Sequence, residues 1–158
     1  MTDNKVTLER FPLRRNEDER GWFTELARAS SLPKPVRQAN LSWSRRGVIR
    51  GLHYHERGQD DLFVCLQGMV RVVVLNRETG ETFTEDIGDD NPVAIYVPGH
   101  HAHGYEALTD ALFCYLVTEE YDAADPDENG VPWDDPRIVD LWSTRSPLLS
   151  ERDQAAAS

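Results

Sequence analysis

Short β-rich segments separated by turn signals fill most of this 158-residue chain. Turn sequences such as Glu78-Thr79-Gly80 and Gly88-Asp89-Asp90-Asn91-Pro92 recur at close spacing between apolar runs. Many short strands at this spacing predict an all-β fold, a sandwich or jelly roll. The predicted strands are Trp22–Leu26, Arg37–Ser44, Val48–His55, Leu62–Leu66, Val70–Asn76, Glu81–Ile87, Ala94–Val97 and Ala111–Val117.

Helical patterns are short and few in this sequence. Leu26–Ser31 is long enough for one turn, and Pro147–Asp153 predicts a short C-terminal helix. We expect residues 1–153 to form a single domain, because this length suits one hydrophobic core. The small residues of Gln154–Ser158 predict a disordered tail.

The charge of the chain limits its partners. It has 17 basic and 28 acidic residues and a net charge of -11, which argues against nucleic acid or an anionic membrane. Lys5 and Lys34 are the only lysines, so most of the positive charge is arginine. Arginine suits phosphate and carboxylate groups, so a small anionic ligand is compatible with the composition.

The sequence also predicts a cytoplasmic location. No apolar run approaches the roughly 20 residues of a membrane span, and the N-terminus has no hydrophobic signal core. Cys65 and Cys114 lie in apolar strand-like runs, and we expect them to be buried, reduced thiols.

Two histidines end the β-rich run Gly47–His55. His53 and His55 are two residues apart, so in a regular strand both rings lie on one face. The same alternation places Ile49 and Gly51 on that face and Arg50, Leu52 and Tyr54 on the other. Two imidazoles on one wall indicate either a proton-transfer site or half of a metal site.

A metal site is one interpretation of these histidines. The order Gly47, His53, His55, then Gln59 or Asp61, then Gly68 approximates the first motif of metal-binding cupins. Pro98-Gly99-His100-His101-Ala102-His103 approximates the second motif, although the expected glutamate is missing from the first. His53, His55, Asp61 and His103 would supply three imidazoles and one oxygen to a divalent transition metal.

Proton transfer is the other interpretation. Tyr115 alternates with Cys114 in an apolar strand, so it can face a pocket while Cys114 packs behind it. A histidine base opposite a tyrosine acid can remove a proton beside a carbonyl and return it on the other face. The structural alternative is a core tyrosine whose hydroxyl bonds to the backbone.

The polar residues of Arg37–Ser44 also allow two interpretations. They either face solvent or form a pocket wall beside His53; they are Gln38, Asn40, Ser42 and Ser44.

An ordered series of motifs resembles the dTDP-4-dehydrorhamnose 3,5-epimerase family of nucleotide-sugar cupins. The matching stretches are Asp18–Glu25, Gln38–Ser44 followed by Gly47–His53, Ala102–Tyr105, Tyr121 followed by Glu128–Pro136, and Leu149–Asp153. They correspond to the family's D-x-R-G-x-F-x-E, Q-x-N-x-S-x-S-x-x-G-V-x-R-G-L-H, A-H-G-F, Y-x-x-x-x-E-x-G-I-x-W-x-D-P and L-S-x-K-D. The resemblance covers about residues 18–153.

The resemblance implies a homodimeric double-stranded β-helix that uses no metal and epimerises a dTDP-4-keto-6-deoxy sugar at C3, C5 or both. It assigns His53 as the base, Asp153 as the carboxylate that orients it, and Tyr115 as the acid. Arg20 and Arg50 match the diphosphate-binding arginines. The remaining substrate-binding positions are Phe23, Glu25, Gln38, Asn40, His103 and Tyr121.

The chain departs from the family at one position that matters for chemistry. The family carries a lysine in a Q-x-K-L pattern, and here Gln59-Asp60-Asp61-Leu62 puts Asp61 in its place. An enolate needs a positive or hydrogen-bonding partner, which a carboxylate does not supply. The family also commonly has glutamine where His55 stands.

We expect a metal-free epimerase. The alternatives are a metal-dependent enzyme using His53, His55, Asp61 and His103, a natural-product isomerase or cyclase acting on a non-nucleotide substrate, and a non-catalytic binding protein.

Overall fold

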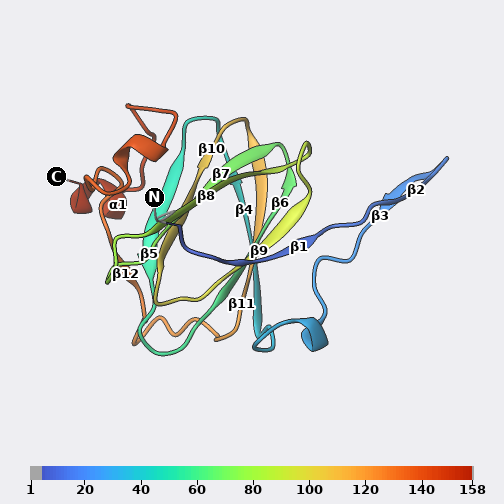
Figure 1. The fold of residues 1–158 in the computed structure, drawn as a ribbon, viewed down its shortest axis with the longest axis horizontal. Helices are drawn as coiled ribbons and strands as arrows, with labels where there is room; N and C mark the ends of the chain where they lie inside the picture. The colour runs from blue at the N-terminus through green and yellow to red at the C-terminus, as the bar shows by residue number, and fades with distance from the viewer. Residues whose placement is uncertain (1–4, 158) are drawn as a thin grey trace.

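Two five-stranded antiparallel sheets packed face to face form the body of the computed structural model, which describes residues 5–157 (Figure 1). The first sheet has the order β1-β9-β6-β11-β4, and the second has the order β12-β5-β10-β7-β8. The first sheet comprises β1 (Glu9–Pro12), β4 (Gln38–Ser44), β6 (Asp61–Gln67), β9 (Val93–Val97) and β11 (Ala111–Val117). The second comprises β5 (Ile49–Tyr54), β7 (Met69–Leu75), β8 (Thr82–Gly88), β10 (Ala102–Ala107) and β12 (Asn129–Gly130). This jelly roll confirms the predicted double-stranded β-helix.

The remaining elements lie outside the two sheets. They are the hairpin β2 (Asn16–Asp18) and β3 (Gly21–Phe23), the 3-10 turns η1 (Ala29–Ser31) and η2 (Val139–Leu141), and the helix α1 (Glu151–Ala156). The sequence pattern did not predict β1, β2, β10 or β12. The expected disordered tail also differs from the structure, because α1 continues through Ala156. Among the described residues, no helix is long and apolar enough to span a membrane.

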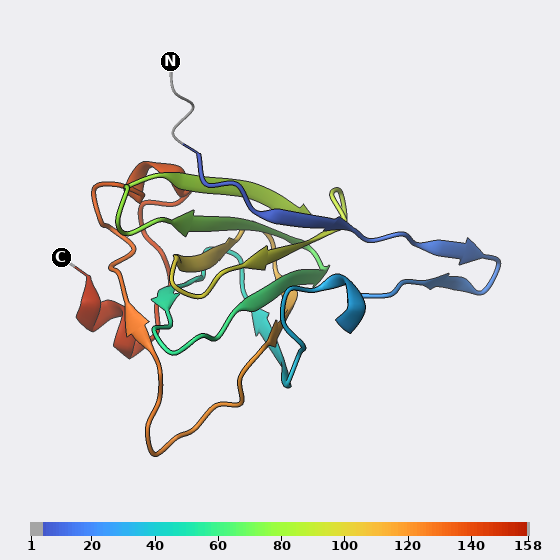
Figure 2. The same ribbon diagram turned by 60° about the horizontal axis from the view of Figure 1, so that its bottom comes forward.

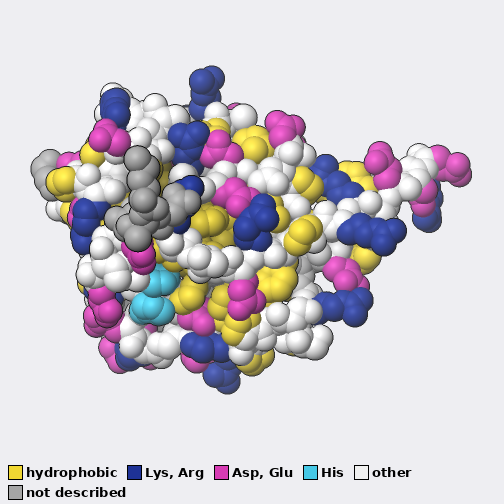
Figure 3. Space-filling view, viewed as in Figure 1, with side chains coloured by type: hydrophobic (Ala, Val, Ile, Leu, Met, Phe, Trp, Pro, Cys, Tyr) yellow, Lys and Arg dark blue, Asp and Glu magenta, His cyan; other side chains and the backbone are white. Residues whose placement is uncertain are grey.

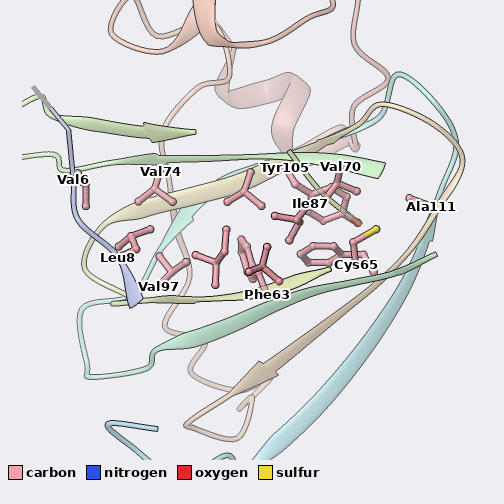
Figure 4. Close-up of a cluster of buried hydrophobic side chains, with 14 residues drawn as sticks. Val6, Leu8, Phe63, Cys65, Val70, Val74, Ile87, Val97, Tyr105 and Ala111 are labelled. Carbon is pink, nitrogen blue, oxygen red and sulfur yellow. The ribbon is translucent and has the colours of Figure 1, made fainter. Parts of the chain in front are cut away.

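The hydrophobic core lies between the sheets and alternates along their strands. From β7, Val70, Val72 and Val74 are buried in this core with side chains from β6, β9 and β11. Figure 4 shows Val70 and Val74 in this cluster. Val73 and Leu75 of the same strand pack in a second cluster on the outer face of the sheet. Because both faces of β7 are covered, its second half, Val72–Leu75, is a continuous apolar run. Cys65 and Cys114 are buried free thiols, as predicted, and burial raises the pKa of Cys65 to about 11.

The C-terminal segment covers the outer face of the second sheet. Ile138 and Trp142 are buried there, and Trp142 Nε1 donates a hydrogen bond of 2.9 Å to the carbonyl oxygen of Trp133. Trp133 also packs against this cluster, so it anchors the acidic segment of residues 123–140 to the barrel. This packing brings α1 beside the end of β5, on the side of the molecule away from the β2–β3 hairpin (Figure 1).

The β2–β3 hairpin projects away from the barrel as an arm (Figure 2). Arg15 lies over the ring of Trp22 at 4.4 Å, yet Trp22 and Phe23 remain 50% and 64% exposed. Figure 3 shows both basic and acidic side chains along this arm. On the barrel, Leu41 and Trp43 of β4 are 61% and 55% exposed. Large apolar side chains this exposed, on an arm and on a sheet edge, are typical of surfaces that pack against another molecule.

Candidate active site

A cavity of about 830 Å³ opens between the two sheets. Strands β4, β6 and β11 contribute to it from the first sheet, and β5 and β10 from the second. Gln38, Asn40 and Ser42 form part of its wall, while Leu41 and Trp43 point outward. Of the two interpretations of this polar strand face, the pocket wall is therefore correct and the solvent-facing one is wrong.

The regular alternation expected along β5 breaks at Gly51. His53 pairs with His103 and Arg50 pairs with Tyr105, so three residue steps on β5 oppose two on β10. Gly51 has a φ of +117°, and a Cβ atom there would lie 2.8 Å from the carbonyl oxygen of His103. A one-residue slip exchanges the faces of a strand. Consequently Arg50 and His53 both line the cavity, and the prediction that they lie on opposite faces is wrong.

His53 forms a dyad with Asp153. His53 Nε2 lies 3.1 Å from Asp153 Oδ1, and the Gly51 amide donates to Asp153 Oδ2 at 3.3 Å. Ser150 caps α1 by accepting from the Asp153 amide, which fixes the carboxylate at the start of the helix. Burial raises the pKa of Asp153, but the hydrogen bond and charge of His53 outweigh burial, and the net shift is downward. The second ring nitrogen of His53, Nδ1, has no hydrogen-bond partner within residues 5–157.

Tyr115 lines the same cavity from β11, which belongs to the opposite sheet from β5. Its hydroxyl makes no hydrogen bond to any of the described residues, so it is not a core tyrosine tied to the backbone. Burial is the main cause of a raised pKa for Tyr115. The phenol therefore keeps its proton at neutral pH and points it into the cavity.

A second histidine–carboxylate cluster lies deeper in the cavity wall. It joins His55 of the β5–β6 connection, Asp61 of β6 and His103 of β10, all buried. Asp61 Oδ2 is 3.2 Å from His103 Nε2, and Asp61 Oδ1 is 3.8 Å from His55 Nε2. Gln59 Nε2 donates to Asp61 Oδ1 at 2.9 Å and contacts His55 Nε2 at 3.2 Å. One carboxylate is thus shared by two imidazoles.

The charges in this cluster follow from its burial and contacts. Burial raises the pKa of Asp61, but the charge and hydrogen bond of His103 outweigh it and lower the pKa overall. Burial lowers the pKa of His103, but Asp61 outweighs that effect and raises it. Burial and the charge of His103 lower the pKa of His55. Asp61 is therefore ionised, His103 binds a proton readily, and His55 is neutral at pH 7.

Backbone contacts far apart in the sequence hold this cluster in place. His55 Nδ1 lies 2.6 Å from the Asp127 carbonyl oxygen, and His103 Nδ1 lies 2.8 Å from that of His101. The His55 amide donates to the Gly99 carbonyl at 2.7 Å. Gly99 also lies against the Gln59 carbonyl, and only glycine fits there, because a Cβ atom would lie 1.6 Å from that oxygen. The sequence analysis missed Asp127, since nothing in a polar loop signals that its backbone carbonyl faces a histidine.

The predicted site residues divide into two groups in the structure. The cavity lining includes Gln38, Asn40, Arg50, His53, His103, Tyr115, Tyr121 and Asp153. Arg20, Phe23 and Glu25 do not line this cavity. Arg20 is on the arm, where it pairs with Asp18 at 2.6 Å, and Glu25 pairs with Arg28 at 2.7 Å. The structure also brings together only three of the four proposed metal ligands, because His53 is paired with Asp153.

The cavity lining has more acidic than basic side chains. Its basic residues are Arg50 and Arg57, and its acidic residues are Asp61, Glu119, Glu120, Asp122, Asp125, Asp127, Glu128 and Asp153. Arg57 is paired with Asp125 at 2.7 Å. Arg50 donates to Ser44 Oγ at 2.8 Å and to the Trp43 carbonyl at 3.2 Å, so it has no acidic partner within residues 5–157. An anionic ligand in this cavity would need positive charge beyond that of Arg50.

Comparison with known families gives a match over nearly the whole chain. The profile of the family described as "dTDP-4-dehydrorhamnose 3,5-epimerase" matches residues 8–158. The spore coat polysaccharide biosynthesis protein SpsL of Bacillus subtilis is 39% identical over 140 residues, which cover 84% of this chain and 92% of that protein. The dTDP-4-dehydrorhamnose 3-epimerase of Streptomyces niveus is 37% identical over 145 residues, covering 85% of this chain and 69% of that protein.

Solved structures show the same similarity. NovW, a 4-keto-6-deoxy sugar epimerase of Streptomyces spheroides, superposes with a TM-score of 0.81 at 31% identity, covering 99% of this chain and 90% of its own. The epimerase RmlC of Legionella pneumophila, solved with dTDP-4-keto-L-rhamnose, gives a TM-score of 0.84 at 29% identity, covering 95% of this chain and 86% of its own. The structural similarity thus extends over nearly the whole chain.

Proposed function

Because this chain belongs to the dTDP-4-dehydrorhamnose 3,5-epimerase family and is an isomerase, we propose that it epimerises a dTDP-4-keto-6-deoxy sugar at a carbon beside the ketone. The observation that carries the proposal is the placement of the His53–Asp153 dyad and Tyr115 on opposite sheets around one cavity. A base and an acid on opposite walls are what inversion of a carbon centre requires.

The dyad supplies the base. His53 Nε2–H donates a hydrogen bond to Asp153, which leaves the lone pair of Nδ1 available. Nδ1 takes the proton from the carbon beside the ketone, and the electrons of that C–H bond form the enolate. Asp153 holds the ring in this tautomer and stabilises the imidazolium that results.

Tyr115 supplies the acid. Its hydroxyl gives a proton to the opposite face of the enolate carbon, which inverts the centre and restores the ketone. The tyrosinate regains a proton from solvent, and His53 releases the one that it took, so the cycle adds and removes one proton. The raised pKa of Tyr115 keeps its hydroxyl protonated at neutral pH.

Substrate binding follows from the polar wall and the arginines. We propose that Gln38, Asn40 and Tyr121 contact the sugar and nucleotide, and that Arg50 binds the diphosphate. Arg50 supports this role because it lines the cavity without an acidic partner in the described part of the chain. Since the rest of the rim is acidic, Arg50 alone is a weak anchor for a diphosphate.

A homodimer would supply the missing positive charge. We propose that the β2–β3 arm of one subunit reaches the cavity of the other and brings Arg20, Phe23 and Glu25 to the substrate. The exposed Trp22, Phe23, Leu41 and Trp43 support this arrangement, because a two-stranded hairpin is marginal in water unless it packs on another surface. The cytoplasmic location expected from the sequence stays a prediction.

Solvent exchange tests the reaction directly. The protein is incubated in D2O with dTDP-4-keto-6-deoxyglucose, and NMR follows deuterium at C3 and C5. We expect deuterium at one or both carbons with wild-type protein and almost none with His53→Gln. If no deuterium enters either carbon and calorimetry detects no dTDP binding, the proposal fails and a non-nucleotide substrate becomes the better hypothesis.

Mixing two inactive variants tests the dimer and its arm. If Arg20 acts in the partner's cavity, a dimer of one Arg20→Ala and one His53→Gln chain has one complete site, and a random mixture regains about a quarter of wild-type activity. A mixture of His53→Gln with the Arg20→Ala/His53→Gln double variant is the matched control and stays inactive. No regain in the first mixture, or a monomeric mass by light scattering, would contradict the arrangement.

A further inference from the structure

The His55–Asp61–His103 cluster has the geometry of a metal-binding triad. One imidazole nitrogen from each histidine and one carboxylate oxygen lie within 4.8 Å of one another. The closest pairs are 3.2 Å between His103 and Asp61 and 3.8 Å between His55 and Asp61. Ligands about 2.0–2.2 Å from a shared ion are roughly 3–3.5 Å apart, so small side-chain movements would close the site around an ion.

The two rings are oriented as metal-bound histidines usually are. Each Nδ1 faces a backbone carbonyl, that of Asp127 for His55 and that of His101 for His103. These contacts fix the tautomer in which Nδ1 carries the proton and Nε2 faces Asp61. Histidine ligands almost always donate their second ring nitrogen to a carbonyl or carboxylate in this way. The orientation therefore comes from the fold and not only from the attraction between His103 and Asp61.

His55 Nε2 and Asp61 share one position in the cluster. His55 Nδ1 faces the Asp127 carbonyl, so its Nε2 is directed toward the Asp61 carboxylate, 3.8 Å away. The side-chain amide nitrogen of Gln59 lies 3.2 Å from His55 Nε2 and 2.9 Å from Asp61 Oδ1. A cation held by these two acceptors would take the place of the amide as their shared partner.

The cluster is accessible from the cavity, which a catalytic cation would require. All three residues line it, although each side chain is less than a tenth exposed. The excess of acidic side chains around the cavity favours entry of a cation.

From this geometry we propose that His55, Asp61 and His103 bind one divalent first-row transition-metal ion through His55 Nε2, His103 Nε2 and a carboxylate oxygen of Asp61. Two imidazoles and one carboxylate are typical of zinc, iron, nickel and cobalt sites and atypical of Mg²⁺ or Ca²⁺, which prefer oxygen donors. The ion would supply positive charge beside the substrate's ketone oxygen. That catalytic consequence rests on the proposed function, whereas the binding itself does not.

Cobalt titration of metal-depleted protein tests the site. The full-length protein is prepared without a histidine tag, treated with a chelator, and titrated with Co²⁺, and visible absorption reports the coordination. We expect one equivalent per chain with the spectrum of a nitrogen–oxygen site, and displacement by one equivalent of Zn²⁺ measured by elemental analysis. Binding below one equivalent, or a spectrum equal to that of hydrated Co²⁺, would overturn the proposal.

Matched variants identify the ligands. His55→Gln and Asp61→Asn should each weaken Co²⁺ binding by about tenfold or more. His100→Gln, an exposed histidine on the neighbouring turn, and His53→Gln should bind as wild type. Equal binding by all four variants would overturn the assignment. If the ligand variants fail to fold by circular dichroism, the wild-type spectrum and the two controls still test the site. Imidazole ligation in the spectrum must be present, and unchanged binding by the controls excludes His53 and His100 as ligands.

The same variants separate this proposal from the proposed function. His53→Gln that binds Co²⁺ but fails to exchange deuterium supports both. One equivalent of Co²⁺ bound by a wild-type protein that exchanges no deuterium supports the metal site alone. Deuterium exchange by a protein that binds no metal supports the epimerase and overturns the metal site.

Discussion

Two histidine–carboxylate sites share one cavity but differ in burial and in the partners of their ring nitrogens. In the first, His53 is 30% exposed and its partner Asp153 10% exposed, and one ring nitrogen is left without a partner in the described residues. In the second, His103 and Asp61 are 3% and 6% exposed, and both nitrogens of His103 are used by the protein. His53 and His103 pair across neighbouring strands, yet their surroundings suit them to different chemical roles.

The difference shows how burial and partner number set the role of a histidine. A partly exposed imidazole such as His53, paired with one carboxylate, can take a proton from a substrate and return it to water. A fully buried carboxylate shared by two rings holds its charge in place, because moving any one group leaves another charge or lone pair unpaired.

The largest effect is expected from removing the base. His53→Gln should lower the rate of deuterium exchange by about 10³-fold, equivalent to about 4 kcal/mol, because it removes the general base without emptying the cavity. NMR of the substrate in D2O measures this rate. His100→Gln is the matched control and should exchange at the wild-type rate. Exchange that survives in His53→Gln would assign the base to another residue.

The second largest effect is expected when the His55–Asp61–His103 cluster is broken, and the quantity that should change is the free energy of unfolding. Asp61→Ala leaves the His103 charge buried without its partner, so we expect a loss of about 3 kcal/mol in the free energy of unfolding. Asp153→Ala, at the more exposed pair, should lose about 1.5 kcal/mol. Urea unfolding in the presence of a chelator compares the two variants. Equal losses would show that burial does not distinguish these sites.

Removing the acid should affect inversion more than exchange. Tyr115→Phe should lower epimer formation by about 10²-fold, equivalent to about 2.7 kcal/mol, because the opposite face of the enolate then lacks its proton donor. Exchange through His53 on the first face should continue. NMR measures both quantities in one sample. If exchange and inversion fall together, Tyr115 acts on the enolate itself and not only on its reprotonation.

The smallest effect is expected from pH. Folding lowers the pKa of Asp153 below its ordinary value of 3.8, because contacts with His53 and Gly51 outweigh burial. The resulting stability is present above about pH 4 and is lost as pH falls through the lower folded pKa. The difference in unfolding free energy between wild type and Asp153→Asn should therefore shrink below pH 4. A difference that is constant with pH would show that the dyad does not stabilise the ionised carboxylate.

Local sequence patterns were enough to predict most strands and part of the site. Alternation and turn residues placed β11 at Ala111–Val117, as observed, and β4 within one residue. They also placed Tyr115 on the cavity side of its strand with Cys114 behind it. These predictions hold because side-chain direction in a regular strand depends on neighbouring residues alone. The strands that were missed are mostly short or polar, such as β2 and β12, and carry little apolar alternation.

The sequence by itself therefore determined the β architecture, the family motifs and the residue types available for chemistry. Only the tertiary structure decided how those residues are grouped. The register shift at Gly51 places Arg50 in the cavity wall. His53 pairs with Asp153, 100 residues away in the sequence, while His55 and His103 both contact Asp61. The reason is physical: strand alternation is fixed locally, whereas a bulge, a helix docked at the far end of the chain and the sharing of one buried carboxylate depend on which distant segments pack together.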